Sequence, residues 1–420
     1  MTDSRSDDVS APRVPLSILD LAIVPEGGSG AQAIRDVIDL SAAAEDLGYR
    51  RIWFAEHHLA AGVASAAPAV LAALAAERTT RIRIGSGAIA LSATSPLQAV
   101  EQFGTIAALH PGRTDLGLGR AFVLPPKNET PDGGAPEREH AAVPAWRRRS
   151  THTPARDVDG LHVPATPAGG ADDDGFRKRL ARRVALIGRS RTPESFRAEV
   201  DLVLGLRAGE HVGPPTAPGE GATVSPPAAG ADFEVWVLAS SGGESARVAG
   251  ELGLPLAANY HVSPSSILAT VAAYRDAFRP GVLSEPYVLV SVDALVADTD
   301  AHARELAEPF VDWVLSVRRT AGGAVAFPRP GTTTPWADRD PAEQALVRDR
   351  IDARFVGSPA TVVERLEALV RVTGADEVLV TTATHDPADR LRSFGLLAQA
   401  WGQPPDIRVG SSSASVTSSR

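Results

Sequence analysis

A short stretch near the N-terminus, WFAEHHL (residues 53–59), brings a carboxylate next to two adjacent imidazoles. Glu56, His57 and His58 directly follow the apolar run RIWFA. An unperturbed imidazole titrates near ~6.5, which suits proton transfer around neutral pH, and a neighbouring carboxylate can fix its tautomer. A proton-transfer site in which Glu56 orients His57 is therefore one interpretation of the stretch. The alternative is that one histidine bonds the backbone and the other is solvated.

The same histidines raise a second alternative, a metal centre of the kind found in hydrolytic barrels. Such a centre needs further His or Asp ligands from other parts of the chain. The sequence offers His261, His385 and Asp386 for this purpose. No HxH pair lies in the first apolar run, however, so we expect no metal at this site.

Small residues in two other segments suit a flat or phosphorylated ligand. GSGAIAL (85–91) ends an apolar run in glycine and alanine, where the backbone either turns or lies close to a flat ligand. In LASSGGESARVAGELGL (238–254), Ser240 and Ser241 precede two glycines and a predicted helix. Hydroxyls, backbone N–H groups and a helix N-terminus suit a phosphate, although an ordinary serine cap has the same composition. No GxxxxGK[ST] motif is present, which favours a mononucleotide phosphate over a nucleoside triphosphate.

A cation follows a further apolar run, in DLGLGRA (115–121). Arg120 lies just beyond the predicted strand. A guanidinium in that position stabilises a phosphate or an anionic ring, or it pairs with a neighbouring acidic residue.

All of these residues follow predicted strands. Apolar runs begin near residues 16, 51, 82, 114, 234, 255, 287 and 376, and helical segments with one apolar face separate them. Eight strand–helix units predict a closed (β/α)8 barrel, with a doubly wound open sheet as the alternative. In such a barrel the active site lies at the carboxyl ends of the strands, which is where the candidate residues follow.

Other segments interrupt this pattern. Residues 122–175 are rich in Pro, Gly, Ala and charged residues without an apolar period, and we expect a long disordered insertion after the fourth strand. Residues 1–14 and 403–420 are expected to be disordered tails, which leaves residues 15–402 for the barrel.

Composition restricts the function further. The chain has 420 residues, a formal net charge of −9 and no cysteine. The net charge argues against a nucleic-acid partner, and the absence of cysteine excludes disulfides, thiolate metal sites and cysteine nucleophiles. Neither a secretory signal nor an apolar span of ~20 residues is present, so we expect a cytoplasmic protein with no membrane partner.

The motifs together resemble the bacterial luciferase-like monooxygenases, which are flavin-dependent (β/α)8 enzymes. The resemblance covers most of residues 16–121 and 233–400. It rests on LDLAIVPEGG, AEDLGYRRIWFAEHH, RIRIGSGAIAL, SPLQAVEQFGTIAALHPGRTDLGLGRA, LASSGGESARVAGELGLPLA, VGSPATVVERLEALV and ADEVLVTTATHD. The segment FVLPPKNETPDGG after Arg120 departs from the family pattern, so the contacts of that loop are not carried over.

The resemblance implies a role for each candidate residue. His57 is the catalytic residue beside the flavin, with Glu56 as its neighbour. Gly87 and Ala88 lie under the isoalloxazine ring and are joined by a cis peptide bond. Arg120 belongs to the flavin site. The phosphate cradle comprises Ser240, Ser241, Gly242 and Gly243.

The resemblance also implies a reaction and its partners. Reduced FMN arrives from a separate flavin reductase, dioxygen is the co-substrate, and a small organic molecule of secondary metabolism is oxygenated by a homodimeric enzyme. Two alternatives remain. One is a deazaflavin-dependent oxidoreductase on the same barrel. The other is a non-catalytic partner subunit, which the altered segment after Arg120 motivates.

Overall fold

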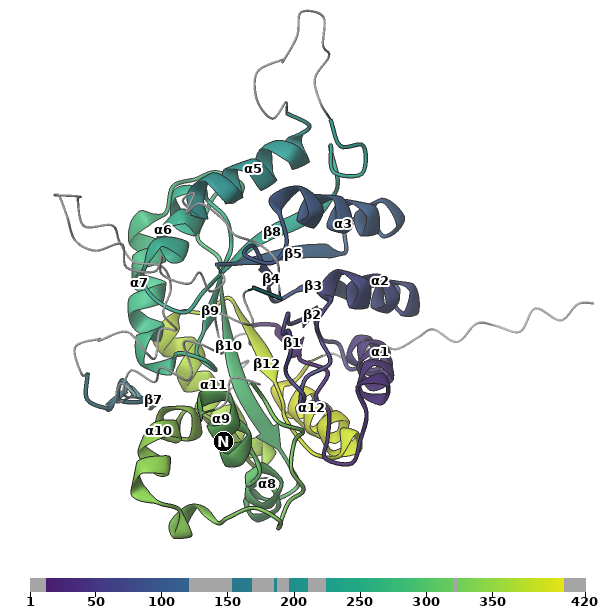
Figure 1. The fold of residues 1–420 in the computed structure, drawn as a ribbon. Coiled ribbons are helices and arrows are strands. Elements are labelled where there is room, and N and C mark those ends of the chain that lie inside the picture. Colours follow the sequence, from purple (N-terminus) through teal and green to yellow (C-terminus); the bar gives the residue numbers. More distant parts are fainter. Residues whose placement is uncertain are drawn as a thin grey trace, which may run out of the picture.

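The centre of the molecule is a closed ring of eight parallel strands (Figure 1). A computed structural model describes residues 13–120, 153–167, 185–186, 196–210, 224–319 and 323–403. The strands follow one another around the ring in chain order, and the β1–β12 and β9–β10 pairings close it. This confirms the (β/α)8 barrel and excludes the open sheet. The strands are β1 (Leu16–Asp20), β2 (Arg51–Phe54), β3 (Arg83–Ser86), β5 (Thr114–Gly119), β8 (Phe233–Ala239), β9 (Leu256–Asn259), β10 (Val288–Val296) and β12 (Glu377–Thr381).

Helices surround the strand ring (Figure 1). Several begin at side chains that satisfy the first free N–H groups: Ser29 accepts from Gln32, and Ser95 forms a reciprocal capping box with Gln98. None of the helices in the described ranges has the length and apolar character needed to cross a bilayer. The ring helices are α1 (Gly30–Asp46), α2 (Pro68–Arg78), α3 (Pro96–Leu109), α5 (Phe196–Ala208), α6 (Glu244–Glu251), α7 (Ile267–Ala277), α11 (Pro359–Thr373) and α12 (Pro387–Trp401).

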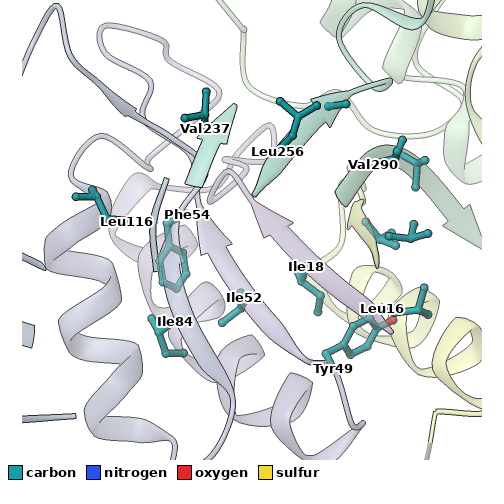
Figure 2. Packing of buried hydrophobic residues seen from close by; sticks show 14 of the residues in the cluster. Leu16, Ile18, Tyr49, Ile52, Phe54, Ile84, Leu116, Val237, Leu256 and Val290 are labelled. Carbon is teal, nitrogen blue, oxygen red and sulfur yellow. The ribbon is translucent and has the colours of Figure 1, made fainter. Parts of the chain in front are cut away.

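Alternation along the strands divides the core into two layers. Ile18, Ile52 and Ile84 are paired at one level on neighbouring strands and belong to the large core between strands and helices (Figure 2). Their chain neighbours Leu19 and Trp53 belong to a separate cluster inside the barrel. The period of two in each strand therefore builds both layers at once.

Gly85 makes room for an indole inside the barrel. A Cβ at Gly85 would lie 2.3 Å from the backbone oxygen of Asp115 and 2.9 Å from Trp53 Cδ1. The Trp53 indole donates to the Asp115 carboxylate at 2.9 Å and meets the Trp236 ring edge-on, with 5.1 Å between centroids. The barrel interior is thus filled by side chains, as in other eight-stranded barrels.

A buried ionic cluster closes the amino ends of the strands. Arg51 donates to Asp115 and to Glu377, both at 2.7 Å, and lies 4.6 Å from the centroid of the Trp236 ring. Burial alone would lower the pKa of Arg51, but these carboxylates together with Glu234 raise it. The charged side chains of this cluster pair with one another within the chain. We therefore expect the active site at the opposite, carboxyl ends of the strands.

The connection between β10 and β12 adds elements to the carboxyl end of the barrel. Phe310, Phe327 and Val347 form a second apolar core with Ile23 and Val63, which lie in the loops after β1 and β2. This core therefore seats the added elements over part of the barrel mouth. The elements are α8 (Asp300–Ala307), α9 (Phe310–Arg319), η3 (Trp336–Asp338), α10 (Pro341–Asp352) and β11 (Phe355–Gly357).

Part of the insertion after β5 is folded, so the expected disorder over 122–175 is wrong for residues 153–167. An antiparallel hairpin pairs β6 (Arg156–Val158) with β7 (Leu161–Val163), and the turn between them has positive φ at both residues. Such a two-residue turn matches the twist of the paired strands. Residues 121–152 lie outside the described part of the chain.

Contacts with the barrel explain why this hairpin is ordered. Leu161 and Val163 are buried in the main core. The Tyr260 hydroxyl donates to the carbonyl of His162 at 2.5 Å, and Arg371 donates to the carbonyl of Asp159 at 2.7 Å. Two alternate apolar side chains are too few to produce a detectable period in the sequence. They are enough to anchor the hairpin when they pack against the folded barrel.

The barrel also includes the last residues of the predicted N-terminal tail. Arg13 donates to Glu367 at 2.9 Å, and the indole of Trp401 donates to the carbonyl of Val14 at 2.8 Å. The expected boundary at residue 14 is therefore two residues too late. Residues 1–12 and 404–420 lie outside the described part of the chain.

Candidate active site

The predicted site residues gather along one half of the barrel mouth. Glu56 and His57 follow β2, and Gly87 and Ala88 separate β3 from the short strand β4 (Ile89–Ala90). Arg120 follows β5, and the Ser-Ser-Gly-Gly turn follows β8. Because β2, β3, β5 and β8 are consecutive in the ring, these groups occupy adjoining positions at the carboxyl ends of the strands.

An apolar floor lies at the end of β3. The peptide bond between Gly87 and Ala88 is cis, as expected. The Gly87 N–H donates to the carbonyl of Phe54 at 2.9 Å, which holds this segment against β2. Ala88 packs on the inner barrel cluster that contains Trp53 and Leu238. The result is a small-residue surface above the barrel interior, suited to a flat ring.

Glu56 bonds to His58, the second histidine of the pair. One carboxylate oxygen of the buried Glu56 side chain lies 2.8 Å from His58 Nε2, and the other accepts the Ala90 N–H at 2.8 Å.

His57 lies at the mouth of the barrel. Its backbone N–H donates to the carbonyl of Ser65 at 2.8 Å, and the residue is exposed. It is also within electrostatic range of His261, which follows β9. Since β2 and β9 are on opposite sides of the ring, the two imidazoles approach each other across the mouth.

His261 is held as a neutral imidazole. Its Nδ1 lies 2.6 Å from the hydroxyl of Ser291 on β10, and its backbone N–H donates to the Ser291 carbonyl at 3.0 Å. Burial lowers the pKa of His261 to about 3, and the nearby Arg350 and His57 act in the same direction. The imidazole is therefore uncharged at neutral pH.

The metal alternative has no support in the arrangement of its candidate ligands. His385 donates to the carbonyl of Glu26 at 3.1 Å, and Asp386 caps α12 by accepting the Ala388 N–H at 2.8 Å. Within the ranges that the structure describes, no three His, Asp or Glu side chains converge as a metal site requires. These two residues have structural roles instead.

The turn between β8 and α6 brings two serines and two glycines to the start of a helix. α6 begins at Gly243 without a side-chain cap, so its first-turn N–H groups are open to a ligand. Ser241 Oγ lies 3.3 Å from the point where a Cβ on Gly243 would be. A Cβ on Gly242 would lie 2.8 Å from the carbonyl oxygen of Ala269, so the turn requires glycine there.

Ser240 is fixed by neighbouring elements. Its hydroxyl accepts from Asn259 Nδ2 at 3.0 Å, and its carbonyl accepts from Ser266 Oγ at 2.8 Å. The hydroxyl hydrogen of Ser240 remains available as a donor to a ligand. The sequence did not single out Asn259 or Ser266, because a polar residue at a strand end has no distinctive pattern until its neighbours are known.

Arg120 contacts the start of α6 through an acidic residue. It donates to Glu244 at 2.5 Å, and Glu244, the first residue of α6, accepts the Phe196 N–H at 3.2 Å. The structure therefore confirms that Arg120 pairs with an acidic residue. The position of Glu244 at the start of a helix could have been inferred from the sequence, because acidic residues favour the first turn of a helix.

Comparisons with known proteins agree with this geometry. The model of the luciferase-like monooxygenase family matches residues 15–144 and 189–377. A luciferase-like monooxygenase of Escherichia coli (strain K12) is 33% identical over 91% of this chain and 96% of its own length. The structure of apo-MsnO8 is 28% identical, with a TM-score of 0.68, and the match covers 94% of this chain and 100% of that one.

More distant structures share the fold. The oxygenating constituent of 3,6-diketocamphane monooxygenase from Pseudomonas putida, solved with FMN, is 18% identical with a TM-score of 0.59 over 92% of this chain and 97% of that one. F420-dependent enzymes also have this fold. The family match extends over well more than half of the sequence and includes the strands that carry the site. The chain belongs to the luciferase-like monooxygenase family.

Proposed function

We propose that this protein is a cytoplasmic monooxygenase that uses reduced FMN and dioxygen to oxygenate a small organic molecule. The observation that carries the proposal is the uncapped N-terminus of α6, which meets the Ser240–Gly243 turn and Arg120 beside an apolar floor. The known FMN complex of a protein with this fold supports the choice of cofactor.

The residues present fit both ends of FMN. A phosphate dianion suits open N–H groups, serine hydroxyls and a guanidinium, and the floor around Ala88 offers an apolar surface to a flat ring. When bound, FMN supplies the redox chemistry through which dioxygen is activated. The protein binds the two ends of the cofactor, orients the ring at the mouth of the barrel and limits access of water.

The loop after β2 supplies the proton-transfer group. We assign this role to the His57 imidazole, which lies at the mouth and gives or takes a proton at a ring nitrogen. Glu56 is a positioning residue, because it holds His58 and the Ala90 N–H and so fixes the loop against the floor. His58 contributes through this contact.

The test compares the reoxidation of reduced FMN with and without the protein. The protein is loaded anaerobically with FMN reduced by an unrelated flavin reductase and is then mixed with air-saturated buffer in a stopped-flow spectrometer. We expect bound FMN to reoxidise at a different rate from free FMN. We also expect label from isotopic dioxygen in a product formed from a metabolite extract. Identical traces with and without protein would contradict the proposal.

The same apparatus tests the deazaflavin alternative, which the F420-dependent enzymes of this fold motivate. Protein that binds F420 in preference to FMN, reduces or oxidises it with a substrate, and consumes no oxygen would establish an oxidoreductase instead. The absorbance spectrum of the bound cofactor distinguishes the two directly.

The proposal includes a homodimer and a transient reductase partner. Val70 and Leu74 on α2 and Leu97 on α3 expose between 45% and 59% of their surface, although α2 and α3 are neighbours on the outside of the barrel. Apolar side chains gathered on one face are typical of a protein interface. We assign this face to a second copy of the chain, which leaves the barrel mouth open to the reductase.

A further inference from the structure

Arg350, in the last turn of α10, lies beside the mouth of the barrel. α10 packs against η2 (Pro264–Ser266), the short 3-10 turn that follows His261. The guanidinium carbon of Arg350 lies 5.9 Å from the centroid of the Phe310 ring, and Arg350 is within electrostatic range of His261. Its side chain is half-buried beside Phe310, a residue of the α9–α10 core.

Arg350 has no hydrogen bond or ion pair with any residue that the structure describes. The nearby carboxylates are occupied by other arginines. Asp349 accepts from Arg318 at 2.6 and 2.8 Å, and Asp293 accepts from Arg354 at 2.6 Å. Three guanidinium groups thus share two carboxylates, and the charge left over is that of Arg350.

An unpaired cation in this place opposes folding. Burial lowers the pKa of Arg350 to about 10, Arg318 and Arg354 act in the same direction, and Asp349 and Asp293 compensate only in part. A partly desolvated charge is costly unless it is paired. Charges of this kind are concentrated at sites where a ligand supplies the missing partner.

His261, which precedes the η2 turn against which α10 packs, offers a second donor. Its Nδ1 is engaged by the Ser291 hydroxyl at 2.6 Å, and its Nε2 has no partner in the described part of the chain. When Ser291 donates to Nδ1, the imidazole carries its hydrogen on Nε2. The neutral ring can then donate one hydrogen bond to an anion that Arg350 holds.

We infer that Arg350 and His261 form an anion subsite that binds the carboxylate of the organic substrate at the mouth of the barrel. The guanidinium binds a carboxylate through two parallel hydrogen bonds, and the His261 Nε2–H adds a third. The inference rests on the proposed function and makes the substrate a small organic acid. The phosphate of the cofactor is the other anion available, but the α6 cradle already suits it.

The test measures the preference for a carboxylate over its neutral amide. Benzoate and benzamide, and hexanoate and hexanamide, are titrated calorimetrically into the protein with and without FMN. We expect the wild type to prefer each carboxylate. Arg350→Gln should reduce that preference roughly tenfold to a hundredfold, the worth of hydrogen bonds to a charged group. Arg350→Lys keeps the positive charge but lacks the two parallel N–H donors of the guanidinium. Its preference should lie between those of wild type and Arg350→Gln.

Arg348 provides the matched control on the same helix. It is exposed, donates to Gln344 at 3.2 Å and lies 5.3 Å from the Trp336 ring centroid. Arg348→Gln removes one positive charge close to Arg350 without touching the mouth. We expect this variant to keep the wild-type preference.

Three results would overturn the inference. The first is a wild type that binds acid and amide equally, and the second is an equal loss in Arg350→Gln and Arg348→Gln. The third is an Arg350→Gln variant with weaker binding of FMN but unchanged binding of riboflavin, which would assign the anion to the cofactor phosphate. These results differ from a failure of the proposed function. A protein that binds no flavin but still prefers carboxylates would refute the proposed FMN-dependent function and leave the anion subsite in place.

Thermal unfolding separates binding from a structural role. Arg350→Met removes an unpaired charge, so we expect the unliganded variant to melt at the same or a higher temperature than wild type. Arg318→Met, by contrast, strands the buried Asp349 carboxylate and should melt lower. Melting of Arg350→Met as low as that of Arg318→Met would make Arg350 a structural residue and overturn the inference.

Discussion

Glu56 and His58 are joined by a 2.8 Å hydrogen bond, and the second oxygen of the same carboxylate holds the backbone N–H of Ala90 at 2.8 Å. This arrangement ties the loop after β2 to the floor beyond β3. Of the two adjacent histidines, His58 makes this contact and His57 lies exposed at the mouth of the barrel. The pair thus combines one anchoring residue with one residue at the mouth.

The two histidines should respond differently to substitution. We expect His57→Ala to leave the fold and FMN affinity nearly unchanged while turnover falls by about 10²–10⁴, the usual worth of a general acid or base. His58→Ala should affect turnover much less, but it leaves the buried Glu56 carboxylate short of a partner and should lower stability by roughly 1–3 kcal/mol. Circular dichroism, flavin titration and oxygen-dependent product formation measure these effects. Small and equal losses of turnover would return both histidines to structural roles.

The phosphate cradle predicts a selective loss of FMN binding. Ser240→Ala with Ser241→Ala removes two hydroxyls, each worth roughly 0.5–1.5 kcal/mol or more toward a charged acceptor. Riboflavin, which lacks the phosphate, is the matched control ligand, and its affinity should not change. Fluorescence titration of both flavins gives the comparison. An unchanged FMN affinity in the double variant would place the phosphate elsewhere.

The hairpin of residues 153–167 should be protected from hydrogen exchange. Tyr260→Phe removes the hydroxyl that donates to His162 and should speed exchange in β6 and β7 by an amount equivalent to about 0.5–1.5 kcal/mol. Tyr49→Phe is the control, because the Tyr49 hydroxyl donates to the carbonyl of Phe394 at 2.9 Å, away from the hairpin. Equal exchange in both variants would show that the Tyr260 contact does not hold the hairpin.

Glu45 should make stability depend on pH. Its carboxylate accepts the N–H groups of Thr80, Arg81 and Ile82 at 2.9, 2.6 and 2.9 Å, respectively. Burial raises the pKa of Glu45, but these bonds outweigh it and lower the pKa below its ordinary value of 4.5. The stabilisation is therefore complete above the unfolded pKa and is lost as pH falls through the folded pKa.

Glu45→Gln should then lower the free energy of unfolding at pH 7 by roughly 1–3 kcal/mol, the range for hydrogen bonds to a charged group. The difference from wild type should shrink as the pH falls through the lowered pKa of the folded-state carboxylate, where the wild-type group becomes protonated. Urea unfolding at several pH values measures it. The exposed Glu77 is the control, and Glu77→Gln should change stability little at any pH. A Glu45→Gln difference that is constant with pH would contradict the assignment.

The exposed apolar face of α2 and α3 predicts a dimer. Charged side chains introduced on this face should disrupt it. Val70→Lys with Leu74→Lys should shift the sedimentation coefficient from dimer to monomer while circular dichroism stays unchanged. Leu391 on α12 is similarly exposed, at 43%, and Leu391→Lys should leave the assembly intact. A wild type that sediments as a monomer would contradict the assignment of this face.

The sequence was sufficient for the barrel and for the placement of the site. Strand and helix periods are local properties, and eight strand–helix units of this length pack in few ways. The same regularity places every residue after a strand at the carboxyl end, so Glu56, His57, Arg120 and Ser240 could be assigned to the mouth before any contact was known. The folded hairpin was missed because two buried residues, Leu161 and Val163, make no detectable period.

Only the tertiary structure decided which groups bond to one another. The partner of Glu56, the acid opposite Arg120 and the unpaired state of Arg350 each depend on distances between elements far apart in the chain. α10, which carries Arg350, lies in the addition between β10 and β12, where no strand–helix period sets its position. Its place over the mouth follows from the apolar core around Phe310 and Phe327, and packing of that kind is set by shape rather than by local sequence.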